Sequence, residues 1–225
     1  MVRITATWAI IIGLAAWCGA EETKVPLKTD IPEEVLAGTP PEVLAMLFPG
    51  LEKLPEGEPP EFLVPQGTVN LALKKPVTSS DENPILGKIE FVTDGNKEGS
   101  EQSFVELAPG KQWVQIDLQK PSEIYAVYLW HYFREARSYH DVIIQVADDA
   151  KFTQNVRTLF NCDQDGSLEL GVGKDTPWIE TYFGKLIDAK GVQARFVRLY
   201  SSGNTANDLN HYVEVELFGK PGSDS

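Results

Sequence analysis

The sequence predicts an all-β sandwich over residues 69–220, and two observations lead to this prediction. After Thr68 the chain changes to β-branched and aromatic runs separated by turns of Gly, Asn and Asp, which is typical of an all-β domain. In residues 113–118 apolar and polar side chains alternate, and residues 195–200 behave similarly, so one face of each strand is buried and the other is wet. About 150 residues with one such pattern make a single domain.

The first twenty residues are typical of a secretory signal peptide. They carry one positive charge at Arg3, an apolar stretch over residues 9–17, and small residues that end at Ala20 before two glutamates. This apolar stretch is too short to span a bilayer as a permanent helix, which needs roughly 20 residues, and no later segment comes close. We therefore expect an exported chain, secreted or periplasmic in a bacterial envelope, without a transmembrane segment.

A lipoprotein anchor on Cys18 is the alternative, but Trp17 stands where lipoprotein processing needs a small side chain. With cleavage after Ala20, Cys162 is the one cysteine left, so no internal disulfide forms and a packed core must supply the stability. We expect Cys162 to be a buried small hydrophobe and not a catalytic thiol.

The net charge of −13 argues against nucleic acid as a partner, because an acidic surface repels phosphate backbones and anionic lipid heads. Neutral glycans, calcium and cationic surfaces remain compatible with this charge.

Residues 21–68 are rich in proline and glutamate, which predicts a linker without a long helix or a paired strand. Within it, Thr39-Pro40-Pro41-Glu42 is a capping box that predicts a helix near residues 40–48, ended by Pro49-Gly50. Its apolar face would consist of Val43, Leu44, Leu47 and Phe48.

Two interpretations of this segment stay open. The short helix packs on its own domain, or residues 32–65 dock to a partner protein of the cell envelope. Residues 221–225 are predicted to be a flexible tail.

Five stretches occur in order along the β region. They are Asn70-Leu71-Ala72 running into Lys75-Pro76-Val77-Thr78-Ser79-Ser80, Phe91-Val92-Thr93-Asp94-Gly95, Trp113-Val114-Gln115-Ile116-Asp117-Leu118, Arg195-Phe196-Val197-Arg198-Leu199-Tyr200 and Glu214-Val215-Glu216-Leu217-Phe218-Gly219. Together they resemble the discoidin family, also called the coagulation factor V/VIII type C domain family, which includes the family 32 carbohydrate-binding modules. The resemblance implies a galactose-binding-like jelly-roll β-sandwich that acts in carbohydrate binding or cell adhesion.

The resemblance also implies a structural calcium ion between the loop after Thr93-Asp94-Gly95 and the last strand. The matching positions are Asp94, Asn96, Gly99 or Ser100, the carbonyl of Val213, and Glu214. Calcium takes about 6 to 8 oxygen ligands, and a turn with alternating oxygen side chains supplies several of them. The alternative is that Asp94-Gly95-Asn96 is simply a turn. An EF-hand is excluded, because Val105 occupies the position of the bidentate glutamate.

Sugars bind carbohydrate-binding members of this family on loops at one end of the sandwich. The resemblance implies that residues 130–140 and 204–212 are such loops. Their candidate ligand contacts are His131, Arg134, Arg137, His140, Asn207, Asn210 and His211. Alternatively, the arginines pair with neighbouring acids.

The three histidines lack a helical two-His spacing, which argues against zinc. Trp113 and Trp130 lie in strand-like runs, so we expect both in the core.

No catalytic motif emerges from the sequence. The chain has too many carboxylates to single out a glycosidase pair, and residues 163–167 are most simply an exposed turn. The leading hypothesis is thus an exported, non-catalytic carbohydrate-binding module with a structural calcium. The alternatives are a protein-interaction or assembly module of the cell envelope and, third, a glycan-active enzyme.

Overall fold

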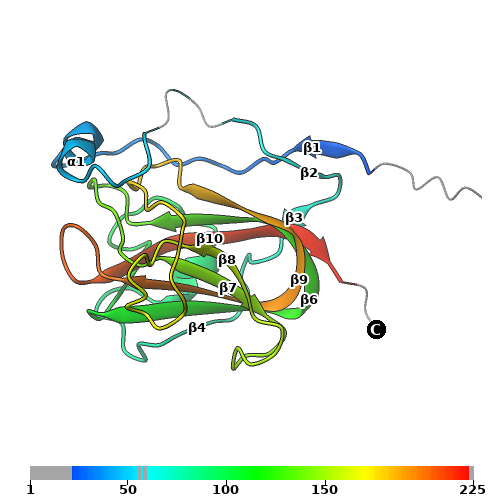
Figure 1. Cartoon of the computed structure of the whole chain (residues 1–225). Coiled ribbons are helices and arrows are strands. Elements are labelled where there is room, and N and C mark those ends of the chain that lie inside the picture. The colour runs from blue at the N-terminus through cyan, green and yellow to red at the C-terminus, as the bar shows by residue number, and fades with distance from the viewer. Residues whose placement is uncertain (1–21, 55–56, 58–59, 223–225) are drawn as a thin grey trace, which may run out of the picture.

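The computed structural model of the chain describes residues 22–54, 57 and 60–222 (Figure 1). The predicted signal peptide with Cys18 and residues 223–225 of the predicted tail lie outside these ranges. Of the helices described, none has the length and apolar character needed to cross a membrane. The elements are β1 (Lys24–Pro26), α1 (Pro41–Leu47), β2 (Leu63–Pro65), β3 (Val69–Asn70), β4 (Val77–Ser79), η1 (Ile89–Thr93), β5 (Val105–Leu107), β6 (Lys111–His131), β7 (Ile143–Ala147), β8 (Arg157–Asn161), β9 (Lys185–Ser202) and β10 (Asn210–Pro221).

The predicted all-β sandwich is confirmed. Eight strands form one antiparallel hydrogen-bonded sheet in the order β3-β10-β6-β9-β7-β8, with β4 beside β6 and β5 beside β10. The long strands β6 and β9 pair along their length, with shifts of register between Asp117 and Ser122 and between Ile124 and Ala126. These irregularities bend the strands, and the sheet folds over into two layers (Figure 1).

The main core lies between these layers. It takes Val114 and Ile116 from the first half of β6 and Val127 and Leu129 from the second half. Side chains of β7, β9 and β10 complete it. The predicted strand over residues 113–118 is the first part of β6, a single strand of 21 residues.

The two predicted core tryptophans have different environments. Trp130 is completely buried, as predicted. Trp113 is half-buried on the outer side of the sheet, where the guanidinium carbon of Arg198 lies 4.4 Å from its ring centroid. The prediction for Trp113 was wrong because alternation identifies two strand faces but not which of them faces the other layer. Cys162 is buried, as expected, and this burial raises the pKa of its thiol to about 12.

The prediction that residues 21–68 contain no paired strand was also wrong. Strands β1 and β2 form a short antiparallel ribbon in which Val25 pairs with Val64. Pro26 and Pro65 lie at the ends of these strands, where a missing backbone N–H removes little pairing. Leu27 N continues the contact by donating to Phe62 O at 2.7 Å.

The predicted short helix is confirmed as α1, but the capping box does not form. Pro40 is the N-cap, no side chain caps the helix, and Pro41 occupies the first helical position. Leu44 is buried, whereas Met46 and Leu47 are 75% and 67% exposed. The apolar side chains of α1 are therefore only partly covered.

The described residues between Glu22 and Thr68, called the N-terminal segment from here on, cover the outer face of one sheet layer (Figure 1). That face carries a second apolar cluster that includes Tyr128, Trp130 and Phe218, and Leu27 and Phe62 pack against it. The segment is thus part of the folded domain rather than a free linker.

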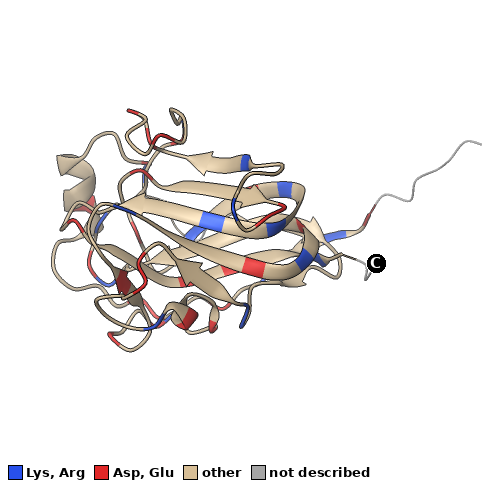
Figure 2. Ribbon diagram, turned by 90° about the horizontal axis from the view of Figure 1, so that it is seen from below, with Lys and Arg blue, Asp and Glu red and all other residues tan. Residues whose placement is uncertain are grey.

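Charge is distributed unevenly between strands and loops. Most Lys and Arg residues lie on or beside the strands, whereas many Asp and Glu residues lie in the loops (Figure 2). The loops therefore carry much of the net negative charge.

Replacing Gly184 with Ala should destabilise the fold by about 3 kcal/mol. Gly184 has a φ of 69°, and an added Cβ would lie 2.5 Å from the Trp130 ring. Gly171→Ala is the matched control. Gly171 also has a positive φ, of 96°, but a Cβ added there would have no atom within 4 Å, so this substitution should cost only about 1 kcal/mol. Urea unfolding of both variants measures the difference, and equal losses would contradict this account of Trp130 packing.

Candidate functional site

The two predicted binding loops lie side by side at one end of the sandwich. Thr205 N donates to Ser138 O at 2.9 Å, and His140 N donates to Gly203 O at 3.0 Å. The Thr205 hydroxyl accepts a hydrogen bond from Ser138 N at 3.1 Å. The segments 131–140 and 204–212 are therefore neighbours in the fold, which the sequence alone did not establish.

Two of the predicted ligand-contact histidines point into the protein. His131 is completely buried, and its Nδ1 lies 2.6 Å from Oε1 of Glu180, which is also buried. His211 Nδ1 lies 2.9 Å from the Tyr139 hydroxyl, and its Nε2 lies 3.1 Å from Glu106 Oε2. Burial, with help from the charges of Arg137 and His131, lowers the pKa of His211 to about 3. The His211 ring is thus neutral.

Arg137 and Asn210 are likewise buried and hold the loops together. Arg137 donates from its guanidinium to Glu135 Oε2 at 2.6 Å and lies 4.6 Å from the Tyr132 ring centroid. Asn210 Oδ1 accepts from Ser201 Oγ and from Gly203 N, both at 2.8 Å. These four predicted contacts have internal partners, so a ligand does not reach them in this conformation.

The other three predicted contacts are accessible. Arg134 is half-buried, whereas His140 and Asn207 are exposed. Asn207 Oδ1 accepts from Asn204 Nδ2 at 2.8 Å and from Leu209 N at 3.0 Å, which fixes its orientation. Sequence reasoning missed Asn204 and Glu180, because only the fold shows that they support these loops.

The predicted cation loop meets the last strand through one residue. Gly95 N donates to Glu214 Oε2 at 3.0 Å, which places the loop beside β10. Val213 lies at a shift of register in β10, between Tyr212 and Glu214. The loop is also a set of turns, since Asp94 Oδ1 accepts from Asn96 N at 2.7 Å.

Two further predicted ligands already have local partners. Asn96 Oδ1 accepts from Glu98 N at 3.0 Å. Ser100 Oγ lies 3.2 Å from Ser103 Oγ, and Ser100 O accepts from Ser103 N. Asp94 and Glu214 are therefore the two predicted positions that bring carboxylates together here.

Glu214 has the electrostatic character that a cation would relieve. Burial, the neighbouring charge of Glu216 and that of Asp94 raise its pKa to about 9, against a hydrogen bond from Gly95. Its Oε1 is buried and has no hydrogen-bond partner within the described ranges. Glu214 therefore holds its proton at neutral pH in the absence of a cation, and Asp94 lies close enough to add to this effect.

Comparisons with known proteins identify the fold. No family model and no curated protein matches the sequence. The chain is similar to a family 32 carbohydrate-binding module of Clostridium perfringens, in complex with GlcNAc-α-1,4-galactose, with a TM-score of 0.50 and 16% identity over 69% of this chain and 97% of that one. The chain has the discoidin-type, galactose-binding-like fold. This confirms the predicted fold.

The chain is also similar to a family 89 glycoside hydrolase of C. perfringens in complex with PUGNAc. The TM-score is 0.51 at 17% identity, over 70% of this chain and 15% of that one. The match therefore concerns a small part of that enzyme.

A second acidic group lies on the discoidin-type sandwich where the sequence predicted a turn. One ligand atom from each of Asp141, Asp163 and Asp165 lies within 4.8 Å of the others, so the group could hold a metal ion. Asp163 is buried, and its oxygens accept hydrogen bonds from Ser167 N at 3.1 Å and Leu168 N at 2.9 Å. The predicted turn is present, but the prediction that it is exposed is wrong for Asp163, whose carboxylate is enclosed by the turn's own backbone N–H groups. Ser167 Oγ links Asp141 to this turn by donating to its Oδ2 at 3.3 Å.

In chelator, the free energy of unfolding should fall as the pH rises between about 4.5 and 9. The folded state keeps the Glu214 proton in this range, whereas the unfolded state releases it, so folding loses up to about 1.4 kcal/mol per pH unit from this group. Urea unfolding at several pH values measures the slope. Glu214→Gln should flatten it, and an unchanged slope in that variant would contradict the raised pKa.

Proposed function

We propose that this chain is a non-catalytic carbohydrate-binding module. The observation that carries the proposal is the junction of residues 131–140 and 203–212 at one end of the sandwich. The accessible side chains of Arg134, His140 and Asn207 supply hydrogen-bond donors and acceptors for sugar hydroxyls. The shared fold with a module bound to GlcNAc-α-1,4-galactose supports the same class of ligand.

Buried side chains in the interior of the domain hold these loops in position. His131, Tyr139, Asn210 and His211 are each nine-tenths or more buried and have internal partners. A site built on such a network is preorganised, so binding orders few additional groups. The role of these buried residues is to position the loops.

The proposal includes export and a division of the chain. Residues 1–20 would be removed as a signal peptide, with a lipid anchor on Cys18 as the alternative. Residues 21–68 form the proline-rich segment, 69–220 the sandwich and 221–225 the tail. The product would be secreted or periplasmic.

The proposal also assigns a structural calcium ion to the loop after η1. Asp94 and Glu214 would hold it by their carboxylates, with Asn96, Ser100 and the carbonyl of Val213 as further oxygen donors. The ion would tie the loop to β10 and would act on stability rather than on chemistry.

A protein-interaction role is the second candidate function, favoured by the exposure of α1. Met46 and Leu47 are its most exposed apolar side chains, and an envelope protein would cover them through residues 32–65. A partner that binds the full chain and is lost in Met46→Ser, Leu47→Ser, together with no binding to glycans, would favour this candidate.

Glycan binding by the full chain should be detectable on a glycan array and by calorimetry. Combined replacement of His140 and Asn207 by Ala should weaken it about thirtyfold, since each side chain contributes on the order of 1 kcal/mol through hydrogen bonds. Gln164→Ala, at an exposed loop position, serves as the control. A folded chain that binds no glycan would overturn the proposal.

Calcium at 100 times its dissociation constant should stabilise the fold by about 2.7 kcal/mol, which is several degrees in melting temperature. Chelator should remove the shift, and Asp94→Ala should abolish it because the loop then lacks one carboxylate. Asp165→Ala tests whether the second acidic group is responsible instead. A shift that survives Asp94→Ala and disappears in Asp165→Ala would contradict the assignment.

A further inference from the structure

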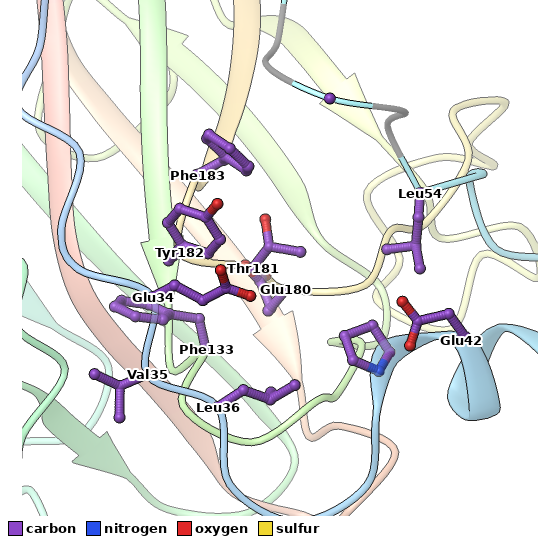
Figure 3. A pocket seen from close by; sticks show the side chains of 12 residues that line it. Glu34, Val35, Leu36, Glu42, Leu54, Phe133, Glu180, Thr181, Tyr182 and Phe183 are labelled. Atoms are coloured by element: carbon purple, nitrogen blue, oxygen red, sulfur yellow. The ribbon is translucent and has the colours of Figure 1, made fainter.

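A pocket lies between the N-terminal segment and the sandwich, beside the segment 131–140 (Figure 3). Its volume is about 370 Å³, within the range of roughly 300 to 1,000 Å³ that small-molecule sites occupy. Glu34 and Glu42 contribute from the N-terminal segment, and Phe133, Tyr182 and Phe183 contribute from the sandwich.

The part of the N-terminal segment that lines this pocket, called its roof here, is bound to the sandwich at two places. Ala37 N donates to Arg134 O at 2.6 Å, in a parallel bridge with the sandwich. Further along, Glu52 N donates to Pro177 O at 2.7 Å, and the Glu52 carboxylate pairs with Lys185. The pocket is therefore preformed, and a ligand does not have to order its walls.

The pocket is acidic. Figure 3 shows the carboxylates of Glu34 and Glu42 turned toward its middle from opposite sides. Neither has a hydrogen-bond or ion-pair partner in the part of the chain that the structure describes, and no Lys or Arg lines the space. Glu180 also lines it, is buried, and has one oxygen, Oε2, without a partner among the described residues.

The pocket is also aromatic. The rings of Tyr182 and Phe183 have centroids 4.2 Å apart, and both side chains are half-buried. Aromatic faces attract organic cations and provide flat apolar surface for the C–H face of a ring. Carboxylates opposite aromatic rings thus favour a ligand that combines a positive charge with a flat apolar face.

The pocket continues into a larger space. A groove of about 1510 Å³ between the N-terminal segment and the outer sheet face shares Leu54, Thr181, Tyr182 and Phe183 with it. A ligand seated in the pocket therefore has room to extend along the domain, which favours one unit of a longer chain over a small free amine.

We propose that this pocket binds a sugar unit that carries a protonated primary amine, within a longer glycan. Glu34 and Glu42 would pair with the ammonium group, and Tyr182 and Phe183 would lie against the ring. The sugar part of this inference rests on the proposed carbohydrate binding, whereas the amine part rests on the pocket alone. The pocket is a separate site from His140 and Asn207.

Calorimetry on the full chain with the β-1,4-linked disaccharide of glucosamine tests the proposal. The N-acetylated disaccharide should bind about tenfold more weakly, because it lacks the charge that makes the hydrogen bonds to carboxylates strong. Glu34→Gln, Glu42→Gln should reduce glucosamine binding by about tenfold or more. Glu33→Gln is the matched control, since Glu33 is an exposed neighbour that does not line the pocket.

Further arms separate this proposal from the loop-end site. His140→Ala, Asn207→Ala should leave glucosamine binding in the pocket unchanged even though it weakens the binding of neutral glycans. A diamine such as cadaverine that binds as tightly as the disaccharide would overturn the sugar part. Binding that is unaffected by the double glutamate variant, or no binding of any amine to the folded chain, would overturn the proposal. Melting curves of each variant establish that it is folded.

Discussion

Between Ala126 and His131, strand β6 carries buried side chains on both of its faces, and the rest of the architecture depends on this constraint. Val127 and Leu129 point into the core between the layers, whereas Ala126, Tyr128 and Trp130 point away from it. An outer face with stacked Tyr128 and Trp130 rings, 4.4 Å between centroids, needs a third layer to keep it from water. The N-terminal segment supplies that layer.

A buried lysine fastens this third layer. Lys97 Nζ donates to Thr29 Oγ1 at 2.6 Å and to Asp30 O at 2.8 Å, and it pairs with Glu216 at 2.9 Å. It also lies 4.5 Å from the Trp130 ring centroid. A buried ammonium group must be fully partnered to be tolerated, so the N-terminal segment and β10 are specified together. Lys97 lies within the loop that carries the predicted cation ligands, and this loop too is therefore held in place.

Much of the sandwich was predictable because alternation of apolar and polar residues reports strands directly. The core position of Trp130 and the sequence of strands followed from such runs, and the five stretches identified the fold. The third layer was not predictable, because its prolines obscured the β1–β2 ribbon. The remaining signal was the unbroken apolar run in β6, which indicates a strand covered on both faces.

The candidate sites divide in the same way. The loops were predicted from residue types. Four of their polar residues were predicted as accessible ligand contacts but are buried, namely His131, Arg137, Asn210 and His211. Burial of such residues follows from long-range packing that the local sequence does not record. The amine pocket was missed entirely because its walls come from residues 34–57, from Phe133 and from residues 180–183, which are distant from one another in sequence.

The segment from His131 to His140 belongs to both proposed sites. Its Phe133 lines the pocket and its Arg134 carbonyl holds the roof through Ala37, while its Ser138 and His140 fasten the second loop. Because the segment is hydrogen-bonded on both sides, neither site can rearrange freely without straining the other. Recognition at both sites thus depends on accessible side chains presented by a fixed backbone, and selectivity lies in their charge and shape rather than in folding on binding.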